Sequence, residues 1–486
     1  MILINPQAGR EKKLGYFSHY VPLVIPFGVA LLAAFLLARG KRVKLLDEEL
    51  NPITEEKLEE AVRDLEEPYI FGFSCLTTNI ARGYELAKLI KNKYPTSKII
   101  FGGIHPTVLS EEVLNTGHVD IVVRGEGETT LNSLYGAIKN NQDFSQIRGI
   151  SFKHRGKIIH NQLADLIDLD ELPPFPYHLF DSQRYDFGFI STSRGCPYNC
   201  IFCSQRNISQ GKIRYFGTDL IINQIRLLIE KYNQRYIFLT DDNFVVNKER
   251  AKDLCEAIVK NGFHNKVIFN CQTRSDAVDE EILGYLKKAN FVCVGLGLET
   301  TSERLMKLIN KGETVEDNIK AIKLIKSAGL KVYGAFIWGL PTETREERWN
   351  SFKLAKKLKI DYVRFNNATP YPGTKLYEMA KSEGRLNIQG IWENLNAVAT
   401  LVDGLDSVPL AYVPLTTTQK ELKKDILRAN LYFYLRPSKI IEMLSKRVNS
   451  SGWFILPKQW YFKPKEWYYL SRLGFYVLRN LFFVIF

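Results

Sequence analysis

The sequence predicts an α/β protein in which a Rossmann-like sheet domain precedes an incomplete (β/α)6 barrel and a helical, aromatic-rich tail. Three observations favour this architecture. Strand-like and helix-like segments alternate through residues 1–150. A connector with three prolines in four residues follows at residues 173–176, and strand–helix units recur from 186 to 400. Such alternation is typical of parallel sheets with helical crossovers.

Composition narrows the class of protein further. A chain of 486 residues, 45% of them hydrophobic, should fold into two or three globular domains. The net charge of +13 would suit nucleic acid, an anionic membrane surface or an acidic substrate. Four of the seven cysteines are scattered singly in apolar runs, which indicates a reducing cytoplasm. Residues 1–6 resemble a strand and turn, and no signal peptide is evident.

The first domain, residues 1–150, contains an apolar stretch at residues 21–38 that is long enough to span a bilayer. We expect a buried helix instead, because Pro22 and Pro26 fit only at its start and Gly40 follows as a stop. The remaining strands are expected at residues 42–47, 69–74, 98–103 and 119–123, with helices at 55–65, 81–94 and 110–114.

Ligands of such sheets bind beyond the carboxyl ends of the strands. Small and hydroxyl residues gather there, at 74–78, 102–107 and 124–128. These stretches resemble the cobalamin-binding domain that precedes many radical S-adenosylmethionine (SAM) domains, chiefly in their Gly-Gly-x-His-Pro and Gly-Glu-Gly-Glu runs. The resemblance implies these cofactor-binding residues: Ser74, Cys75, Thr77, Thr78, Gly102, Gly103, His105, Gly125, Glu126 and Gly127.

The chain departs from other cobalamin proteins in one respect. It has no Asp-x-His-x-x-Gly run, so no histidine is placed to bind cobalt from below. The resemblance therefore implies base-off cobalamin without a protein imidazole, and His105 is expected to be a turn or nucleotide-loop contact. A domain that binds nothing, or that only shapes the substrate site, is the alternative.

Residues 151–185 are expected to form a linker. Alternating segments at 149–153 and 157–160 predict a small hairpin. The prolines of residues 172–177 then force an extended connector. We therefore place the domain boundary there.

Three thiols follow the strand expected at 187–193, in the spacing Cys-x3-Cys-x2-Cys at Cys196, Cys200 and Cys203. Three thiolates on one loop can bind three irons of a [4Fe–4S] cluster and leave the fourth iron open. A structural zinc site would require a fourth ligand nearby, and none follows within twenty residues of Cys203. The loop resembles that of the radical SAM enzymes, including the aromatic Phe202. This likeness implies SAM bound at the open iron and its reductive cleavage to a 5′-deoxyadenosyl radical.

Five further strands, at 236–240, 267–270, 291–295, 331–336 and 362–366, complete a predicted barrel of six. Its binding groups should lie at the carboxyl ends of the strands. By resemblance, residues 241–243 lie near the SAM amino end and the others near its ribose, carboxylate or adenine. These residues are Asp241, Asp242, Asn243, Asn270, Arg274, Glu299 and Gly339. A plain hydrogen-bonding role at the top of the barrel is the alternative for each.

The last region, residues 401–486, should begin with a helix capped by Thr418 and ending at Tyr434. Aromatic residues are interleaved with Lys and Arg after position 452. This pattern suits either a membrane interface or a helix packed over the barrel mouth.

The whole pattern resembles the cobalamin-dependent radical SAM enzymes over residues 1–435. The resemblance implies a [4Fe–4S] cluster, SAM and cobalamin, and an external flavodoxin- or ferredoxin-like electron donor. We expect methyl transfer to an unactivated carbon of a small-molecule or lipid-like substrate, in the cytoplasm, with peripheral membrane contact but no nucleic acid. The alternatives are oxidative cyclisation or rearrangement of a tetrapyrrole or other natural product, methylthio transfer to RNA, and a cobalamin-binding regulator.

Overall fold

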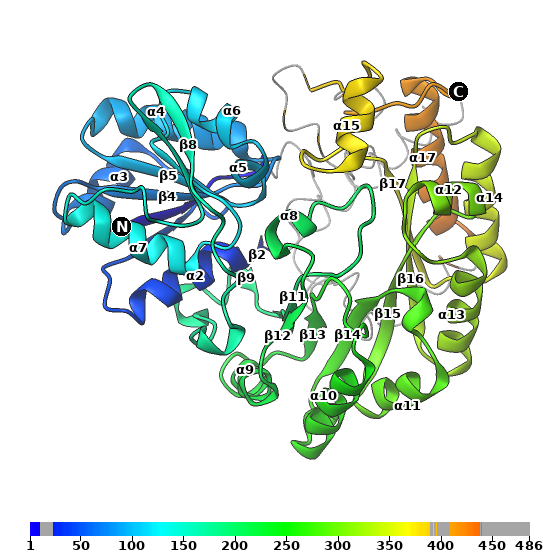
Figure 1. Ribbon diagram of the computed structural model, residues 1–486. Helices are drawn as coiled ribbons and strands as arrows, with labels where there is room; N and C mark the ends of the chain where they lie inside the picture. Colours follow the sequence, from blue (N-terminus) through cyan, green and yellow to red (C-terminus); the bar gives the residue numbers. More distant parts are fainter. Residues whose placement is uncertain (10–22, 389–391, 393–394, 396–408, 438, 440–486) are drawn as a thin grey trace, which may run out of the picture.

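The computed structural model describes residues 1–9, 23–388, 392, 395, 409–437 and 439 (Figure 1). The first sheet has seven strands. In spatial order they are β3 (Lys44–Asp47), β1 (Ile2–Asn5), β4 (Ile70–Ser74), β5 (Lys98–Gly102), β6 (Ile121–Val123), β7 (Ile150–His154) and β8 (Lys157–His160). The first five strands are parallel. The hairpin β7–β8, expected within the linker, instead extends this sheet, because β7 pairs antiparallel with β6.

Helices cover both faces of this sheet. Helices α2 (Phe27–Leu37) and α7 (Glu128–Lys139) pack on one face, and α3 (Glu55–Val62), α4 (Ile80–Lys93) and α6 (Ser110–Asn115) pack on the other. The buried helix expected at 21–38 is confirmed in α2, which begins only after Pro26, the N-cap residue. Within the described part of the chain, no helix is long and apolar enough to cross a membrane.

The second sheet confirms the six parallel strands expected from the sequence. In order they are β10 (Phe189–Ile190), β13 (Tyr236–Leu239), β14 (Ile268–Thr273), β15 (Phe291–Glu299), β16 (Lys331–Trp338) and β17 (Tyr362–Asn367). The outer layer is helical and shares one core with the strands. Its members are α9 (Thr218–Glu230), α10 (Lys248–Lys260), α11 (Glu280–Lys288), α13 (Val315–Ser327), α14 (Arg345–Lys357) and α17 (Gln419–Tyr434). The strands curve with these helices outside, as in a partial barrel (Figure 1).

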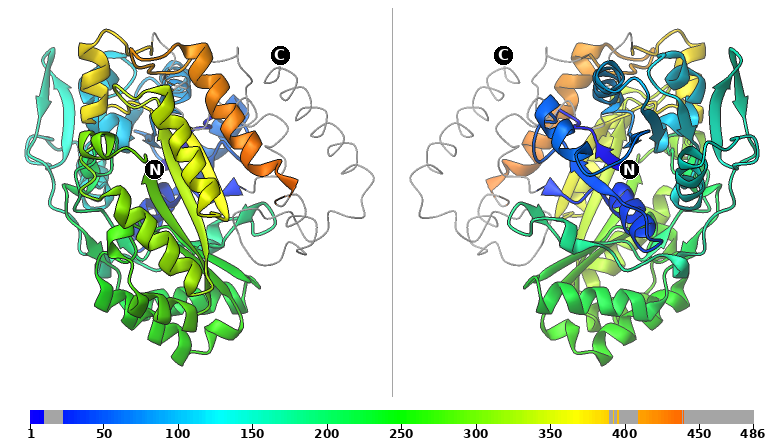
Figure 2. Two further views of the ribbon diagram at one scale, coloured as in Figure 1. Left: turned by 90° about the vertical axis from the view of Figure 1, so that its right-hand side faces the viewer. Right: turned by 90° about the vertical axis from the view of Figure 1, so that its left-hand side faces the viewer.

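Helix α17, the last helix among the described residues, completes the outer edge of the last strand. It begins at the expected cap, where Thr418 Oγ1 accepts a hydrogen bond from Glu421 N, and it ends at Tyr434. The Asn430 amide accepts from Phe365 N at 3.2 Å and donates to Phe365 O at 3.0 Å. The Tyr434 hydroxyl contacts Val363 N and O in the same way. Side chains thus take the hydrogen bonds that a further strand would make, and Figure 2 shows the helix beside the last strands.

The aromatic and basic tail expected at the C-terminal end falls on residues 440–486, which lie outside the described residues. Its membrane or packing role stays a prediction.

The Asn430→Ala substitution should destabilise the protein by about 2–4 kcal/mol, because two buried backbone groups of β17 would lose their partner. Thermal unfolding measures the effect. Lys420→Ala is the matched control, since Lys420 is exposed on the same helix and should change stability by less than about 0.5 kcal/mol. Equal melting temperatures for the two variants would show that α17 does not support β17.

Candidate functional site

The cysteine loop leaves the barrel after β11 (Ser193–Arg194), which pairs with β12 (Arg214–Tyr215). All three cysteines are free thiols; Cys196 and Cys200 are half-buried and Cys203 is exposed. Cys203 interacts electrostatically with both others, so the thiols lie near one another. Burial raises the pKa of Cys200 to about 11, and the positive charge of Lys311 opposes this effect. Three neighbouring free thiols on one loop are a donor set that fits a [4Fe–4S] cluster, and bound iron would ionise them.

Asp241, at the end of β13, holds the strand that leads into this loop. Its buried carboxylate accepts hydrogen bonds from Thr192 Oγ1 at 2.8 Å, from Thr192 N at 3.3 Å and from the Ser193 hydroxyl. Gly195, two residues after Ser193, has φ of +94°, and a Cβ there would collide with the Lys212 carbonyl oxygen. Asp241 therefore fixes the residues that lead into the cysteine loop. Its expected contact with SAM stays a prediction.

Arg274, which follows β14, holds the loop from a second side. Its guanidinium carbon lies 3.6 Å from the ring centroid of Tyr198, between the first two cysteines. It also donates to Asp276 at 2.6 and 3.0 Å and to Lys311 O at 2.5 Å. With its donors engaged in this way, Arg274 ties the cysteine loop to the segment after β15.

Lys311 places a buried cation at the end of β15. Its ammonium lies 2.9 Å from Glu299 and 3.2 Å from Glu313, and it donates to the Gly297 carbonyl. Glu299 adopts φ of +54°, a conformation that costs energy in a residue other than glycine. Lys311 interacts electrostatically with Cys200, so this charged group adjoins the cysteine loop.

Four further residues predicted from the sequence, Asn243, Asn270, Phe202 and Gly339, each have their own contacts in the barrel half. Asn243 accepts from Thr273 Oγ1 at 2.7 Å, and Asn270 donates to Tyr236 Oη at 3.2 Å. Asn243 Nδ2 and Asn270 Oδ1 are buried and have no partner among the described residues, so each could bind a ligand. Phe202 packs in a small hydrophobic cluster with α15 (Lys375–Ser382).

Gly339, the last of these residues, follows β16 with φ of +83° and packs against Leu422 of α17. Its amide donates to the carboxylate of Glu343, which is fully buried. Burial raises the pKa of Glu343 to about 8 despite the nearby positive charge of Arg348.

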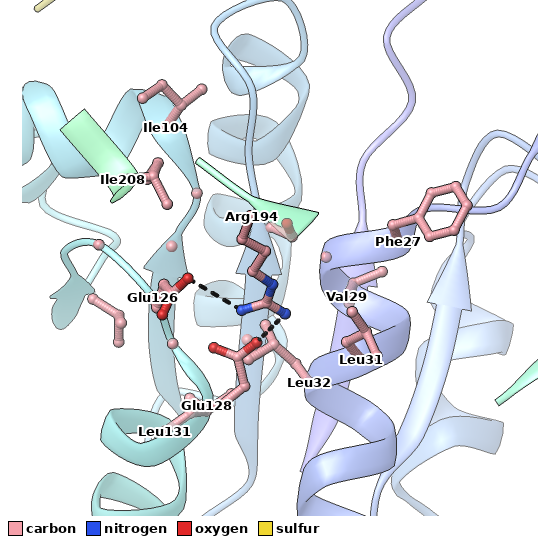
Figure 3. A pocket seen from close by; sticks show the side chains of 18 of the residues that line it. Phe27, Val29, Leu31, Leu32, Ile104, Glu126, Glu128, Leu131, Arg194 and Ile208 are labelled. Atoms are coloured by element: carbon pink, nitrogen blue, oxygen red, sulfur yellow. Dashed lines mark hydrogen bonds and ion pairs between the residues drawn. The ribbon is translucent and has the colours of Figure 1, made fainter. Parts of the chain in front are cut away.

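A cavity of about 540 Å³ opens between the N-terminal domain and the barrel (Figure 3). Six of the residues predicted to bind cobalamin line it: Ser74, Gly102, Gly103, Gly125, Glu126 and Gly127. Residues from α2 and from the segment after Cys203, including Ser204 and Gln205, line it too. Cavities of this size hold cofactors.

The cavity wall is shaped by close contact between strand ends. Gly103 has φ of +101°, and a Cβ there would lie 2.5 Å from Cys75 O, so only glycine fits. Cys75, Thr77, Thr78 and His105 are not on the wall. His105 is fully buried in α5 (Ile104–Val108), 3.2 Å from Glu112, and no histidine among the described residues lines the cavity. The expected lack of an imidazole ligand to cobalt stays a prediction.

Comparison with known proteins assigns a family to the N-terminal domain and to the barrel. The Radical SAM superfamily profile matches residues 190–355, and the B12 binding domain profile matches residues 15–135. An uncharacterized methyltransferase of Pyrococcus horikoshii is 32% identical over 424 residues, covering 86% of this chain and 89% of the relative. The chain belongs to the radical SAM superfamily, in the group that also carries a B12-binding domain.

Other relatives of this radical SAM protein differ in function. An anaerobic magnesium-protoporphyrin IX monomethyl ester cyclase of Cereibacter sphaeroides is 27% identical and covers 74% of this chain and 60% of its own. The structure of TsrM, a radical SAM methyltransferase from Kitasatospora setae with cobalamin and a [4Fe–4S] cluster bound, superposes with a TM-score of 0.69 at 17% identity. It covers 90% of this chain and 89% of its own, and the likeness supports the fold.

The family's cofactors are a [4Fe–4S] cluster, SAM and cobalamin, and the protein is an enzyme. Sequence reasoning missed Lys311, Glu313 and Arg214, which the fold buries or half-buries beside the predicted residues. Each looks like an ordinary surface charge in the sequence. Lys311, placed between Asn310 and Gly312 after a short helix, α12 (Glu303–Leu308), offered only a weak signal.

The Glu343→Gln variant should be more stable than the wild type at pH 9 and nearly equal to it at pH 5. The folded protein holds the Glu343 proton more tightly than the unfolded chain, so stability falls as pH rises from about 4.5 to about 8. At one pKa unit per about 1.4 kcal/mol, the cost above pH 8 is on the order of several kcal/mol. Glutamine keeps an acceptor for Gly339 and removes the charge.

Melting temperatures measured from pH 5 to pH 9 test this expectation. The Glu346→Gln control alters an exposed carboxylate in α14, the helix that begins two residues after Glu343, and its melting-temperature curve should not cross that of the wild type. A constant offset between Glu343→Gln and the wild type at every pH would contradict it.

Proposed function

We propose that this radical SAM protein transfers a methyl group to an unactivated carbon with the help of cobalamin. The observation that carries the proposal is the shared cavity. Gly103 and Gly125 of the B12-binding half line it together with Ser204 and Gln205, which follow the third cysteine of the barrel half. One cavity is therefore bounded by the loops predicted to hold cobalamin and by the residues directly after the cysteine loop, a closeness that group transfer between the two cofactors requires.

In this proposal the thiols of Cys196, Cys200 and Cys203 hold the cluster. When bound, the cluster supplies the electron that cleaves SAM, and cobalamin supplies the carrier of the methyl group. The residues of the chain hold the cysteine loop in place. Asp241 fixes the strand before the cysteines, and Arg274 fixes Tyr198 between them.

Lys311 and Glu299 are suited to the charged end of SAM. SAM carries an ammonium and a carboxylate, and Lys311 and Glu299 offer one opposite charge for each, beside the cysteine loop. Glu313 balances Lys311 when Glu299 turns to a ligand, because it lies 3.2 Å from the same ammonium. The unpaired Asn270 Oδ1 is a further acceptor for the ribose.

Cobalamin is assigned to the cavity wall. Ser74, Gly102, Gly103, Gly125 and Gly127 leave room for close backbone approach by a large ligand. The apolar side chains of α2, among them Val29 and Leu32, form the opposite wall and suit the flat nucleotide base. In this scheme Cys75, Thr77, Thr78 and His105 support the wall from behind.

The substrate is expected to combine an apolar body with a polar group. We infer the lipid-like body from the sequence of the C-terminal tail. We infer the polar group from β17. Val363 and Phe365 of this strand pack toward the helices, so Arg364 and Asn366 lie on the concave face of the barrel. Arg364 is exposed there, beside the small Ala335 of β16. A membrane contact and an external electron donor remain parts of the proposal.

Oxidative cyclisation is the second candidate function. The specific observation in its favour is the similarity to a magnesium-protoporphyrin monomethyl ester cyclase. Both reactions need the same three cofactors, so the cofactor-binding residues alone do not separate them.

The Cys200→Ala variant should lose SAM cleavage by more than about a hundredfold while it still binds cobalamin, because one iron would lose its thiolate. Iron content and 5′-deoxyadenosine formation are measured on anaerobically reconstituted protein. Cys255→Ala, a buried cysteine of α10, is the control and should keep both. Normal cleavage by Cys200→Ala would disprove the cluster assignment.

Methyl transfer predicts a product heavier than the substrate by one methylene. With SAM labelled by three deuterium atoms in its methyl group, the mass of the product should rise by a further three units. Mass spectrometry of extracts incubated anaerobically with the holoenzyme provides the measurement. A product that has lost hydrogen, or that carries no label, would favour the cyclase instead.

A further inference from the structure

A cluster of buried ion pairs joins the cysteine loop to the cavity wall. Arg194 Nη1 lies 3.2 Å from Glu126 Oε1, and Arg194 Nη2 lies 2.7 Å from Glu128 Oε1. All three residues line the cavity, and Figure 3 shows the guanidinium between the two carboxylates. Arg194 belongs to the barrel half and the glutamates to the N-terminal half. The contact therefore bridges the two cofactor-binding halves at the cavity itself.

A second arginine secures Glu126. Arg214, opposite Arg194 on β12, contacts Glu126 Oε2 at 2.9 Å and Oε1 at 2.5 Å. Ile167 N donates to the same carboxylate at 3.3 Å. Glu126 is thus held whether or not Arg194 is present, whereas Glu128 has only Arg194 as an ion-pair partner among the described residues.

The connection from Arg194 to the first cysteine is short and stiff. One residue, Gly195, separates Arg194 from Cys196, and the Lys212 carbonyl oxygen lies so close to it that a Cβ would not fit. On the other side, Asp241 fixes Ser193 and Thr192. A displacement of the Arg194 side chain relative to the glutamates would therefore be a displacement of the cysteine loop relative to the cavity wall.

Stability alone does not account for this arrangement. The Glu126 and Glu128 side chains are only 7% and 5% exposed, and burying such charges costs about as much as their pairing returns. The same two halves already meet through a hydrogen bond that is not an ion pair, from Tyr185 Oη to Asp47 Oδ2 at 2.7 Å. What the ion pairs add is a fixed, bidentate geometry at the cavity.

We propose that Arg194 is a positioning residue that fixes the corrin-binding loop, residues 125–128, relative to the cysteine loop, residues 196–203. Its effect is on methyl transfer from SAM to cobalamin and not on reductive cleavage of SAM, which needs only the barrel half. In the transfer, the methyl group leaves the SAM sulfonium, the reduced cobalt supplies the electron pair, and S-adenosylhomocysteine is released. The inference rests on the proposed function.

The test uses reconstituted holoenzyme with reduced cobalamin and SAM, without substrate. Arg194→Lys keeps the positive charge but cannot hold both carboxylates in a planar fork. Glu128→Gln is the second variant and removes one pair from the other side. Tyr185→Phe is the control, since it weakens the contact between the same halves away from the cavity.

S-adenosylhomocysteine and 5′-deoxyadenosine are quantified together. We expect Arg194→Lys to lower the ratio of the first to the second by about tenfold or more, since small misplacements have effects of this size. Tyr185→Phe should keep the wild-type ratio even where it lowers the melting temperature. An unchanged ratio in both Arg194→Lys and Glu128→Gln, or an equal loss in Tyr185→Phe, would overturn the inference.

Pulsed electron paramagnetic resonance gives a readout independent of turnover. The distance distribution between cob(II)alamin and the reduced cluster should broaden in Arg194→Lys and stay narrow in Tyr185→Phe. Equal widths would count against the positioning role. A wild type that binds no cobalamin and makes no S-adenosylhomocysteine would instead refute the proposed function, so the two failures are distinguishable.

Discussion

The hold of Asp241 on the strand before the cysteines is the interaction on which the site depends. A buried carboxylate is costly unless it is hydrogen-bonded, and here Thr192 and Ser193 supply three donors. This fixes the backbone from which Arg194 and Cys196 extend. The cysteine loop and the ion pairs of Arg194 with the N-terminal domain therefore both start from the segment that Asp241 holds at the end of the barrel.

The regular elements could be predicted because their signals are local. The six parallel strands of the barrel and the Thr418 cap follow from apolar runs and from a hydroxyl before a helix. The pairing of hairpin β7–β8 with β6 could not be predicted in this way. A hairpin has the same sequence pattern whether it stands alone or docks on a sheet, and its place depends on the open edge of β6, where Val122 pairs with Ser151.

The residues of the candidate site also divide into those with a local sequence signal and those that only the fold reveals. The spacing of the three cysteines is visible in the chain, and so are the glycines that line the cavity. Lys311 and Arg214 gave no comparable signal, because a lysine or arginine in sequence looks solvated until the fold encloses it. Asp241 shows the converse limit. A carboxylate at the end of a barrel strand suits a ligand or a neighbouring segment of the chain, and the sequence alone did not indicate the contacts with Thr192.

Helix α17 has a consequence for how the chain is made. During synthesis, Phe365 and Val363 of β17 leave the ribosome 65 and 71 residues before Asn430 and Tyr434, their respective partners at the outer edge of the strand. In that interval the edge of the strand is bare and open to pairing with other chains. The outer edge of β17 therefore stays vulnerable to aggregation until helix α17 has emerged as well.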